Sequence, residues 1–248
     1  MAGHSKWSNI KNKKAKGDAA RGRVFTKLGR ELAVAVKSGG ADPATNSRLY
    51  DVIAKCKAAN MPNDNIQRGI KKAAGELSSI NYESVTYEGY GIGGSAVIVE
   101  ALTDNKNRTA GDVRHAFDKF GGAMGLPNSV MYMFDRLGVI AAERTPELSE
   151  DAVMEYAIES GADDVIVQDD VFEIHTAPSA FSAVRNFLEG KGMEFLSAEI
   201  ELIPQNYVTL EGDKLETFNK MLSLMDDNDD IQGVFHNVDL PEDEEQQF

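Results

Sequence analysis

Apolar residues recur at helical spacing in the first third of the chain. A helix is expected over residues 18–37, because four large apolar side chains fall on one side of it: Phe25, Leu28, Leu32 and Val36. Gly39 and Gly40 follow and are expected to end it. A second helix is predicted over 46–59. A third is predicted after Pro62, where Asp64 and Gln67 stand in the positions of a capping box. Three short helices predict a small helical domain with its own core.

From Tyr82 onward the apolar pattern changes to period two, which is typical of strands. Strands are predicted over 82–88 and 96–102, followed by a helix over 109–120. Two strands and one helix are too few to close a core, so these elements need a later partner. Near the end of the chain, a helix over 213–225 and a strand over 233–238 could supply it.

The segment between these two pieces looks self-sufficient. Its predicted strands cover 130–134, 139–142, 165–175 with a turn at Asp169 and Asp170, and 195–203, and its predicted helices cover 150–159 and 179–188. The order β-α-β-β-α-β favours a ferredoxin-like domain. The predicted fold class is therefore α+β in three domains. These are a basic helical domain at 1–80, a discontinuous α/β domain made of 81–128 with 205–238, and a ferredoxin-like domain at 129–204. An acidic tail at 239–248 follows.

Charge separates the helical domain from the rest of the chain. Residues 1–78 hold 16 Lys or Arg and 6 Asp or Glu, whereas residues 79–248 hold 10 and 34. The two parts therefore carry net charges of +10 and −24 within a chain of net charge −14. A basic block on an acidic protein indicates a polyanion partner, because Lys and Arg that meet phosphates release condensed counterions. The alternative is a solvated face with no partner.

The basic residues of the first long helix form a second pattern. Arg23, Lys27, Arg30 and Lys37 cluster on the side opposite the apolar stripe, and we call them the basic stripe. Before it, the arm of residues 1–16 has five lysines around Trp7, which suits stacking on an exposed base but could equally anchor the arm to the protein's own core. The candidate nucleic-acid-binding residues are Lys6, Trp7, Lys11, Lys13, Lys14, Lys16, Arg21, Arg23, Lys27, Arg30, Lys71 and Lys72.

Motifs for catalysis or metal binding are missing from the sequence. The four histidines share no metal-ligand spacing, and there is no Walker loop, nucleophile elbow or zinc-protease motif. Residues 89–94 are rich in glycine, as phosphate-binding loops are. They join two predicted strands, so no helix N-terminus follows them and they are a weak candidate for phosphate binding. The single cysteine, Cys56, lies on an apolar stripe and is expected in a core. We expect no enzyme activity, no cofactor and no bound metal. With no membrane-length apolar run, we expect a cytoplasmic location.

Several blocks of the sequence resemble the YebC family. The segments that carry the resemblance are AGHSKWSNIKNKK at 2–14, RGRVFTKLGREL at 21–32, YEGYGIGGSAVIVEALTDNKNRT at 87–109 and VRHAFDKFGG at 113–122. The family includes bacterial proteins named as probable transcriptional regulators and the mitochondrial translational activator of cytochrome c oxidase subunit one. The resemblance implies three domains and no enzyme activity. It also implies one of two roles. Some members of the family are described as DNA-binding regulators, and others as ribosome-associated factors that help translation through difficult stretches such as proline runs. The sequence departs from the family at Asn128, where a glycine usually precedes Ser-Val.

The sequence thus predicts a non-enzymatic, nucleic-acid-binding regulator of gene expression. A basic helix face reads phosphates rather than bases, which favours folded RNA or the ribosome and a role in translation. The alternative is a DNA-binding transcriptional regulator. A second alternative is an enzyme hidden in the α/β part, with the glycine loop and Arg108 as candidates. No membrane partner is expected.

Overall fold

The structure is a computed structural model that describes residues 18–75 and 81–240. It consists of two compact units. One unit combines the described residues from Asp18 to Phe134 with Pro204–Leu240, and the other is Asp135–Ile203. The larger unit thus joins two pieces of chain that lie on either side of the smaller one in the sequence. The division into three domains at the boundaries given above stays a prediction.

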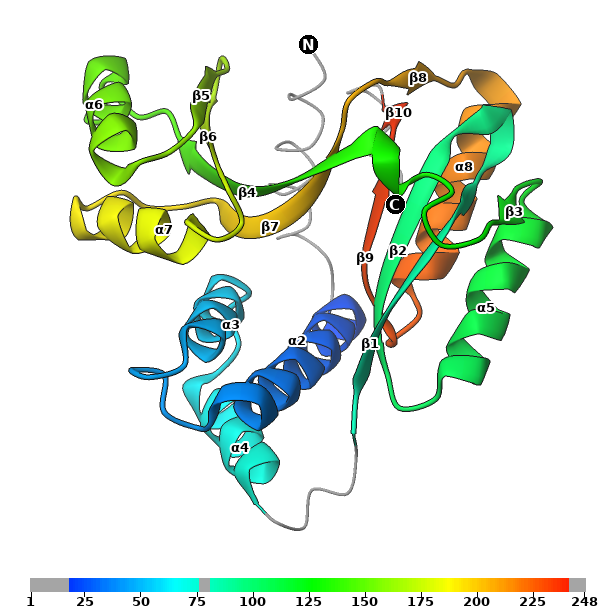
Figure 1. Ribbon diagram of the computed structural model, residues 1–248, viewed down its shortest axis with the longest axis horizontal. Coiled ribbons are helices and arrows are strands. Elements are labelled where there is room, and N and C mark those ends of the chain that lie inside the picture. The colour runs from blue at the N-terminus through cyan, green and yellow to red at the C-terminus, as the bar shows by residue number, and fades with distance from the viewer. Residues whose placement is uncertain (1–17, 76–80, 241–248) are drawn as a thin grey trace. The chain divides into compact units, whose positions relative to one another are not determined.

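The three N-terminal helices form where the apolar spacing predicts them, and Figure 1 shows them in blue and cyan. They are α2 (Asp18–Gly39), α3 (Ser47–Ala58) and α4 (Asn63–Ala74). The apolar stripe of α2 packs with α3 and α4 into a core that includes Cys56. At the start of α3, the Asn46 side chain accepts a hydrogen bond from the Leu49 amide. The capping box predicted for α4 is wrong, because Pro62 is the N-cap residue and makes no side-chain cap.

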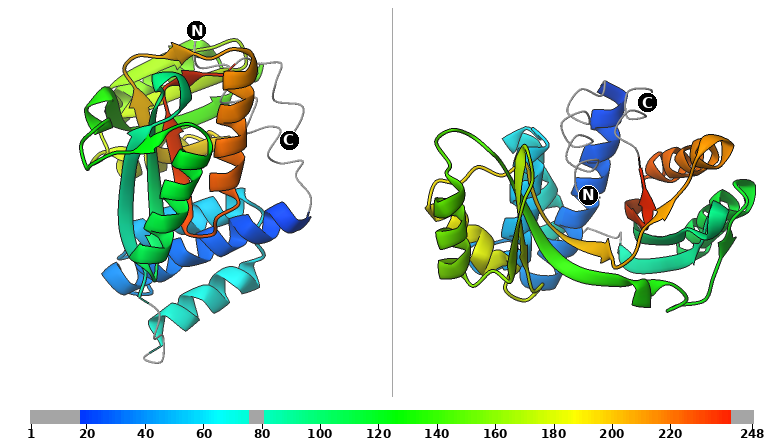
Figure 2. Two further views of the ribbon diagram at one scale, coloured as in Figure 1. Left: turned by 90° about the vertical axis from the view of Figure 1, so that its right-hand side faces the viewer. Right: turned by 90° about the horizontal axis from the view of Figure 1, so that it is seen from above.

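A four-stranded sheet in the order β3-β1-β2-β9 forms the rest of the larger unit. Its strands are β1 (Glu83–Tyr90), β2 (Ala96–Thr103), β3 (Ala123–Met124) and β9 (Ile231–His236). The helices α5 (Lys106–Lys119) and α8 (Gly212–Asp226) lie side by side on one face (Figures 1 and 2). Val97, Phe117 and Phe218 lie in the core beneath them. Strand β9 pairs with β2 and therefore completes a sheet that begins more than a hundred residues earlier in the chain.

Short elements complete this unit and correct two sequence predictions. The 3-10 helices η1 (Ile92–Gly94) and η2 (Met131–Met133) lie in loops, and β8 (Val208–Thr209) pairs with β10 (Val238–Asp239). Helix α5 begins three residues before its predicted start because the Asn105 side chain caps it. The two strands predicted at 130–134 and 139–142 are instead η2 followed by one strand, β4 (Phe134–Glu143). Gly138, which falls between the two predicted strands, lies inside β4 and pairs with Thr176.

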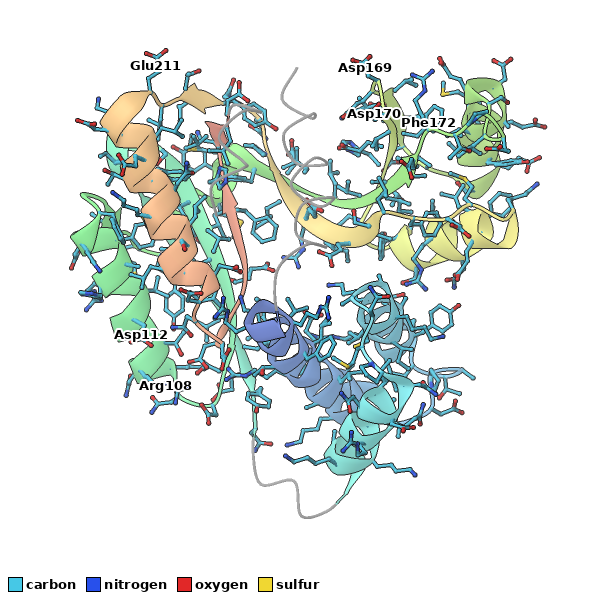
Figure 3. The ribbon with its side chains drawn as sticks, turned by 180° about the vertical axis from the view of Figure 1, so that it is seen from behind. Arg108, Asp112, Asp169, Asp170, Phe172 and Glu211 are labelled. Atoms are coloured by element: carbon cyan, nitrogen blue, oxygen red, sulfur yellow. The ribbon has the colours of Figure 1, made fainter. Side chains whose placement is uncertain are left out.

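The smaller unit has the predicted ferredoxin-like order of elements. After β4 come α6 (Glu150–Ser160), β5 (Asp164–Val167), β6 (Val171–Thr176), α7 (Phe181–Gly190) and β7 (Ser197–Pro204). The strands form a sheet in the order β5-β6-β4-β7, and Asp169 and Asp170 lie at the turn between β5 and β6 (Figure 3). Helices α6 and α7 bury Val153, Leu188 and their neighbours against Ile140 and Ile174. The fold class is α+β, as predicted.

A buried carboxylate shapes the loop after β3. Glu88 is only 5% exposed, and its carboxylate accepts hydrogen bonds from the backbone amides of Asn128, Val130 and Met131 at 2.7–2.9 Å. Asn128 adopts a φ of 65°, the left-handed conformation that favours glycine. Asparagine is among the side chains that tolerate this conformation best. The loop therefore keeps a glycine-like backbone without the glycine.

Candidate nucleic-acid interface

The structure describes half of the twelve candidate nucleic-acid-binding residues. Lys6, Trp7, Lys11, Lys13, Lys14 and Lys16 lie outside the described residues. Four of the others, Arg21, Arg23, Lys27 and Arg30, lie on α2, and Lys71 and Lys72 lie on the last turn of α4. Their surroundings differ. Arg21, Lys71 and Lys72 are exposed, whereas the Lys27 and Arg30 side chains are only 13% and 14% exposed.

Three of the four cations of the basic stripe bind acidic residues of the same unit. Arg23 Nη2 lies 3.1 Å from an Asp227 carboxylate oxygen. Lys27 Nζ lies 3.1 Å from an Asp226 carboxylate oxygen and 2.8 Å from the Asp226 carbonyl oxygen. Arg30 pairs with Asp230 and donates to the Leu102 carbonyl oxygen at 2.9 Å. We call these three ion pairs the clasp, and residues 226–230 between α8 and β9 the acidic turn.

Asp230 is the centre of the clasp. It is 3% exposed, and besides Arg30 it accepts hydrogen bonds from Thr109 Oγ1 at 2.6 Å and Arg108 Nη2 at 2.8 Å. Burial alone would raise the pKa of Asp230. The hydrogen bonds from Thr109, Arg30 and Arg108 outweigh burial and lower its pKa to about 2. The bond to Asp230 in turn raises the pKa of Arg108. This network fixes α2 against the start of α5 and the acidic turn.

The clasp shows what the basic stripe of α2 contacts within the chain. The stripe was predicted to bind a polyanion, and in the structure three of its four cations pair with acidic residues of the same unit. The helical spacing of the sequence correctly separates the apolar side of α2 from its basic side. It gives no information about which residues of the folded chain contact each side. The partners are about 200 residues away in the sequence, within a run of acidic residues in which no single position stands out. Sequence reasoning therefore missed Asp226, Asp227 and Asp230.

Exposed cations remain on α3 and α4. Lys71 and Lys72 are exposed and have no acidic partner in the part of the chain that the structure describes. Arg48 and Lys57 of α3 are also exposed, although neither was among the predicted residues. Arg68, one turn before Lys72, donates to the Asp64 carbonyl oxygen at 3.2 Å and to the Asn65 side chain. This second group of cations is open to a polyanion without any rearrangement.

The features that suggested chemistry have structural explanations. The glycine-rich segment forms η1 and leads into β2, so no helix N-terminus follows it. Arg108 lies one turn from Asp112 on α5 and is tied to Asp104 as well as Asp230 (Figure 3). Burial raises the pKa of the Cys56 thiol to about 12, which makes it a poor nucleophile. Among the described residues, no group of His, Cys, Asp and Glu is arranged to hold a metal ion.

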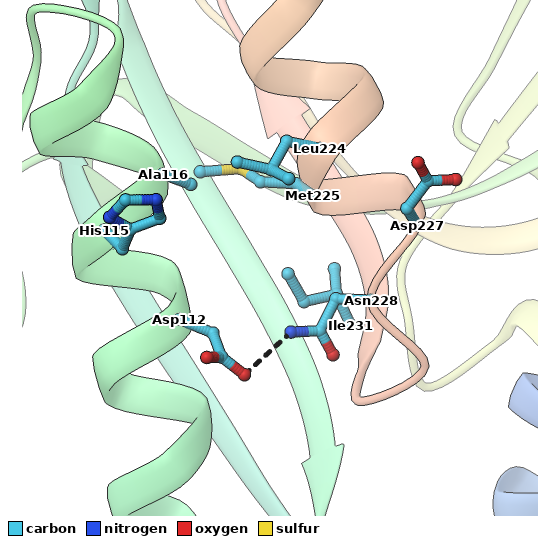
Figure 4. A pocket seen from close by; sticks show the side chains of 8 residues that line it. All are labelled: Asp112, His115, Ala116, Leu224, Met225, Asp227, Asn228 and Ile231. Atoms are coloured by element: carbon cyan, nitrogen blue, oxygen red, sulfur yellow. Dashed lines mark hydrogen bonds between the residues drawn. The ribbon is translucent and has the colours of Figure 1, made fainter.

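One open hollow lies between α5 and α8 (Figure 4). It has a volume of about 240 Å³, with an apolar floor that includes Leu224 and Met225. Asp112 accepts a hydrogen bond from the Asn228 side chain at 3.2 Å across its rim, and His115 lies beside them. These polar groups do not converge on a point inside the hollow. It therefore lacks the arrangement expected of a small-molecule site.

None of the helices in the described ranges is long and apolar enough to cross a bilayer.

Comparisons with known proteins agree with the fold. The family model of the TACO1/YebC N-terminal domain matches residues 5–76, and that of the TACO1/YebC second and third domain matches residues 82–238. A "Probable transcriptional regulatory protein" of Acetivibrio thermocellus is 58% identical over 96% of this chain and 98% of its own length. Another, of Thermoanaerobacter pseudethanolicus, is 49% identical over 99% of this chain and 100% of its own length.

A solved structure shows the same architecture. The crystal structure of a conserved hypothetical protein from Aquifex aeolicus matches with a TM-score of 0.81 at 43% identity. It covers 92% of this chain, and this chain covers 94% of it. The family models together span nearly the whole sequence, and the relatives align from end to end. The chain belongs to the TACO1/YebC family.

Proposed function

We propose that this protein is a non-enzymatic, nucleic-acid-binding regulator of gene expression that acts on RNA or the ribosome to support translation. The observation that carries the proposal is the exposed group of cations on α3 and α4, which belongs to a segment of net charge +10 in a chain of net charge −14. Lysines spread over a helix surface bind phosphates without reading bases. Such binding suits a folded RNA, which proteins recognise mainly by shape and backbone.

A DNA-binding transcriptional regulator is the second candidate. The observation that favours it is the name of the relatives, which describes them as probable transcriptional regulatory proteins. Direct readout of DNA needs several donors and acceptors that reach base edges in a groove. Within the described residues, the cations of α4 are Arg68, which donates hydrogen bonds within its own helix, and two lysines in the last turn, which bind phosphates better than bases.

A salt titration tests the phosphate-binding surface. We expect Lys71→Gln with Lys72→Gln to weaken binding to a structured RNA. The slope of log affinity against log salt should also fall by about 0.7 to 0.9 for each phosphate that the variant no longer neutralises. The matched control is Lys119→Gln with Lys214→Gln, which removes the same charge from exposed lysines of the acidic part. An equal effect of both double substitutions would show that only net charge matters. It would contradict the proposal that Lys71 and Lys72 belong to a phosphate-binding surface.

The choice between RNA and DNA needs a separate comparison. Affinities for ribosomes, a structured RNA and random duplex DNA should be measured at the same physiological salt concentration. Trp7→Ala is expected to weaken RNA or ribosome binding by about 1–3 kcal/mol, because base stacking on the indole is removed, and to change duplex binding much less. A defined DNA site bound more than about a thousandfold over random duplex, without ribosome association, would favour the transcriptional role.

A further inference from the structure

The basic stripe and the acidic turn match each other as a binding site matches its ligand. Arg23, Lys27 and Arg30 lie four and three residues apart, so at about 1.5 Å per residue they span roughly 10 Å of α2. All three meet carboxylates of one short turn, and two of the ion pairs have an N–O distance of 3.1 Å. A phosphate oxygen would bind the same nitrogen atoms at a similar distance. The carboxylates therefore occupy positions that a phosphate backbone could take.

The pairs of the clasp differ in how firmly they are held. Asp226 and Asp227 have side chains that are 57% and 56% exposed, and the Arg23 side chain is 42% exposed. Exposed ion pairs of this kind contribute only about 0–1 kcal/mol each and weaken with salt. Asp230 is 4% exposed at its side chain and has four donor groups, counting Thr103 at 3.2 Å. Lys27 is more enclosed, since its side chain is 13% exposed and it also donates to the Asp226 carbonyl oxygen at 2.8 Å. The two outer carboxylates are still more easily displaced than Asp230, which is the firm anchor.

We propose that the acidic turn competes with nucleic acid for the basic stripe, so that a polyanion binds Arg23 and Lys27 by displacing Asp227 and Asp226 while Arg30 stays on Asp230. The inference rests on the proposed function and adds the basic stripe of α2 as a further contact with nucleic acid, one that the acidic turn regulates. A phosphate chain can bind both cations at once, and counterions are released from each phosphate that it brings to them. A single small anion gains too little to displace the turn, so the clasp selects for extended polyanions.

The test removes the negative charges without touching the stripe. Asp226→Asn with Asp227→Asn should tighten binding of a structured RNA hairpin about five- to tenfold at low salt, since two weak competing pairs are removed. The matched control is Asp213→Asn with Glu216→Gln, which changes the charge by the same amount at the other end of α8. This control should change affinity much less. Circular dichroism should be native for both, because all four residues are exposed.

A second pair of substitutions assigns the gain to the stripe. Adding Arg23→Gln and Lys27→Gln to the Asp226→Asn/Asp227→Asn protein should abolish the increase in affinity. A gain that persists without these cations would overturn the competition, as would an equal gain in the α8 control. If the wild-type protein and every variant fail to bind RNA and duplex DNA even at low salt, the proposed function itself fails. If the wild-type protein binds and the turn variant binds no better, only the competition fails.

Discussion

Asp230 illustrates how one residue can hold two parts of a chain together. Its carboxylate lies among Arg30, Arg108 and Thr109 and is almost completely buried. Asp230→Ala would leave these donors without their partner. We expect it to lower the free energy of unfolding by about 3 kcal/mol, the order found when a buried pair loses one member. Chemical denaturation measures the change, and Asp229→Ala, the half-buried neighbour, should cost much less.

Asn128 gives a prediction about backbone conformation. Its φ of 65° strains most side chains, whereas glycine adopts this conformation without cost. Asn128→Gly should leave stability unchanged or slightly improved. Asn128→Val should lower the unfolding free energy by about 1–2 kcal/mol, because a β-branched side chain is poorly tolerated in this conformation. Thermal unfolding of the two variants compares them directly, and equal melting temperatures would contradict the interpretation.

His236 makes stability depend on pH. Burial lowers the pKa of His236 to about 4, well below its ordinary value near 6.5. Between these values the unfolded chain binds a proton that the folded protein does not bind, so stability should fall as pH decreases from about 6.5 to about 4. The expected decrease is roughly 2–3 kcal/mol. His236→Gln should flatten the urea-denaturation profile in this range. Asp230 stabilises the folded protein at neutral pH and adds to the pH dependence only in more acidic solution, because its stabilisation is lost as pH falls from 3.8 to about 2.

At the scale of residues, the sequence predicts which apolar side chains are buried better than it predicts which groups the charged side chains bind. The apolar positions Leu28, Leu32 and Val36 are buried as their spacing indicates. The environments of Arg30 and Glu88 could not be predicted in the same way, because each finds its partners through folding of distant segments. A charged residue in a helical or alternating pattern is expected to be exposed. Only the folded chain shows that Glu88 accepts three backbone hydrogen bonds and that Arg30 meets Asp230.

At the scale of elements, periodicity located most helices and strands, and local chemistry explains the errors. The helical spacing of α2 and the order of elements in the smaller unit were predicted correctly. The start of α5 was missed because an asparagine cap outweighs the weak apolar signal of its first turn. Strand β4 was predicted as two strands, with Gly138 between them. The missing side chain of Gly138 is what lets the strand pass its neighbours.

Gly138 yields a prediction for β4. A Cβ atom there would lie 2.7 Å from both Phe181 Cδ2 and Thr176 Cγ2. Gly138→Ala should therefore destabilise the smaller unit by about 1–3 kcal/mol, the usual cost of overpacking. Gly190→Ala in α7 is the matched control, because nothing lies within 4 Å of the added atom and alanine favours a helix. Hydrogen exchange of β4 and β6 amides should rise in the first variant and stay unchanged in the second.

At the scale of the whole molecule, charge is divided between parts with different roles. The segment of net charge +10 contains the exposed cations, and the remaining net charge of −24 would repel phosphate. The fragment 79–248 should accordingly bind nucleic acid much more weakly than the whole protein in a filter-binding assay. Equal affinity would place the site in the acidic part. The sequence predicted this division, because net charge follows from composition and needs no folded structure.

The clasp also has a consequence for the order of events during synthesis. Arg30 is separated from Asp230 by 200 residues, and β9 joins β2 across a long stretch of chain as well. A ribosome makes roughly 5–20 residues per second, so the acidic turn is synthesised about 8 to 30 seconds after α4. Throughout that interval the nascent chain presents Arg23, Lys27 and Arg30 uncovered, next to the RNA of the ribosome that is making it. Closing of the clasp is thus a late step of biogenesis, possible only once residues 226–230 have been made.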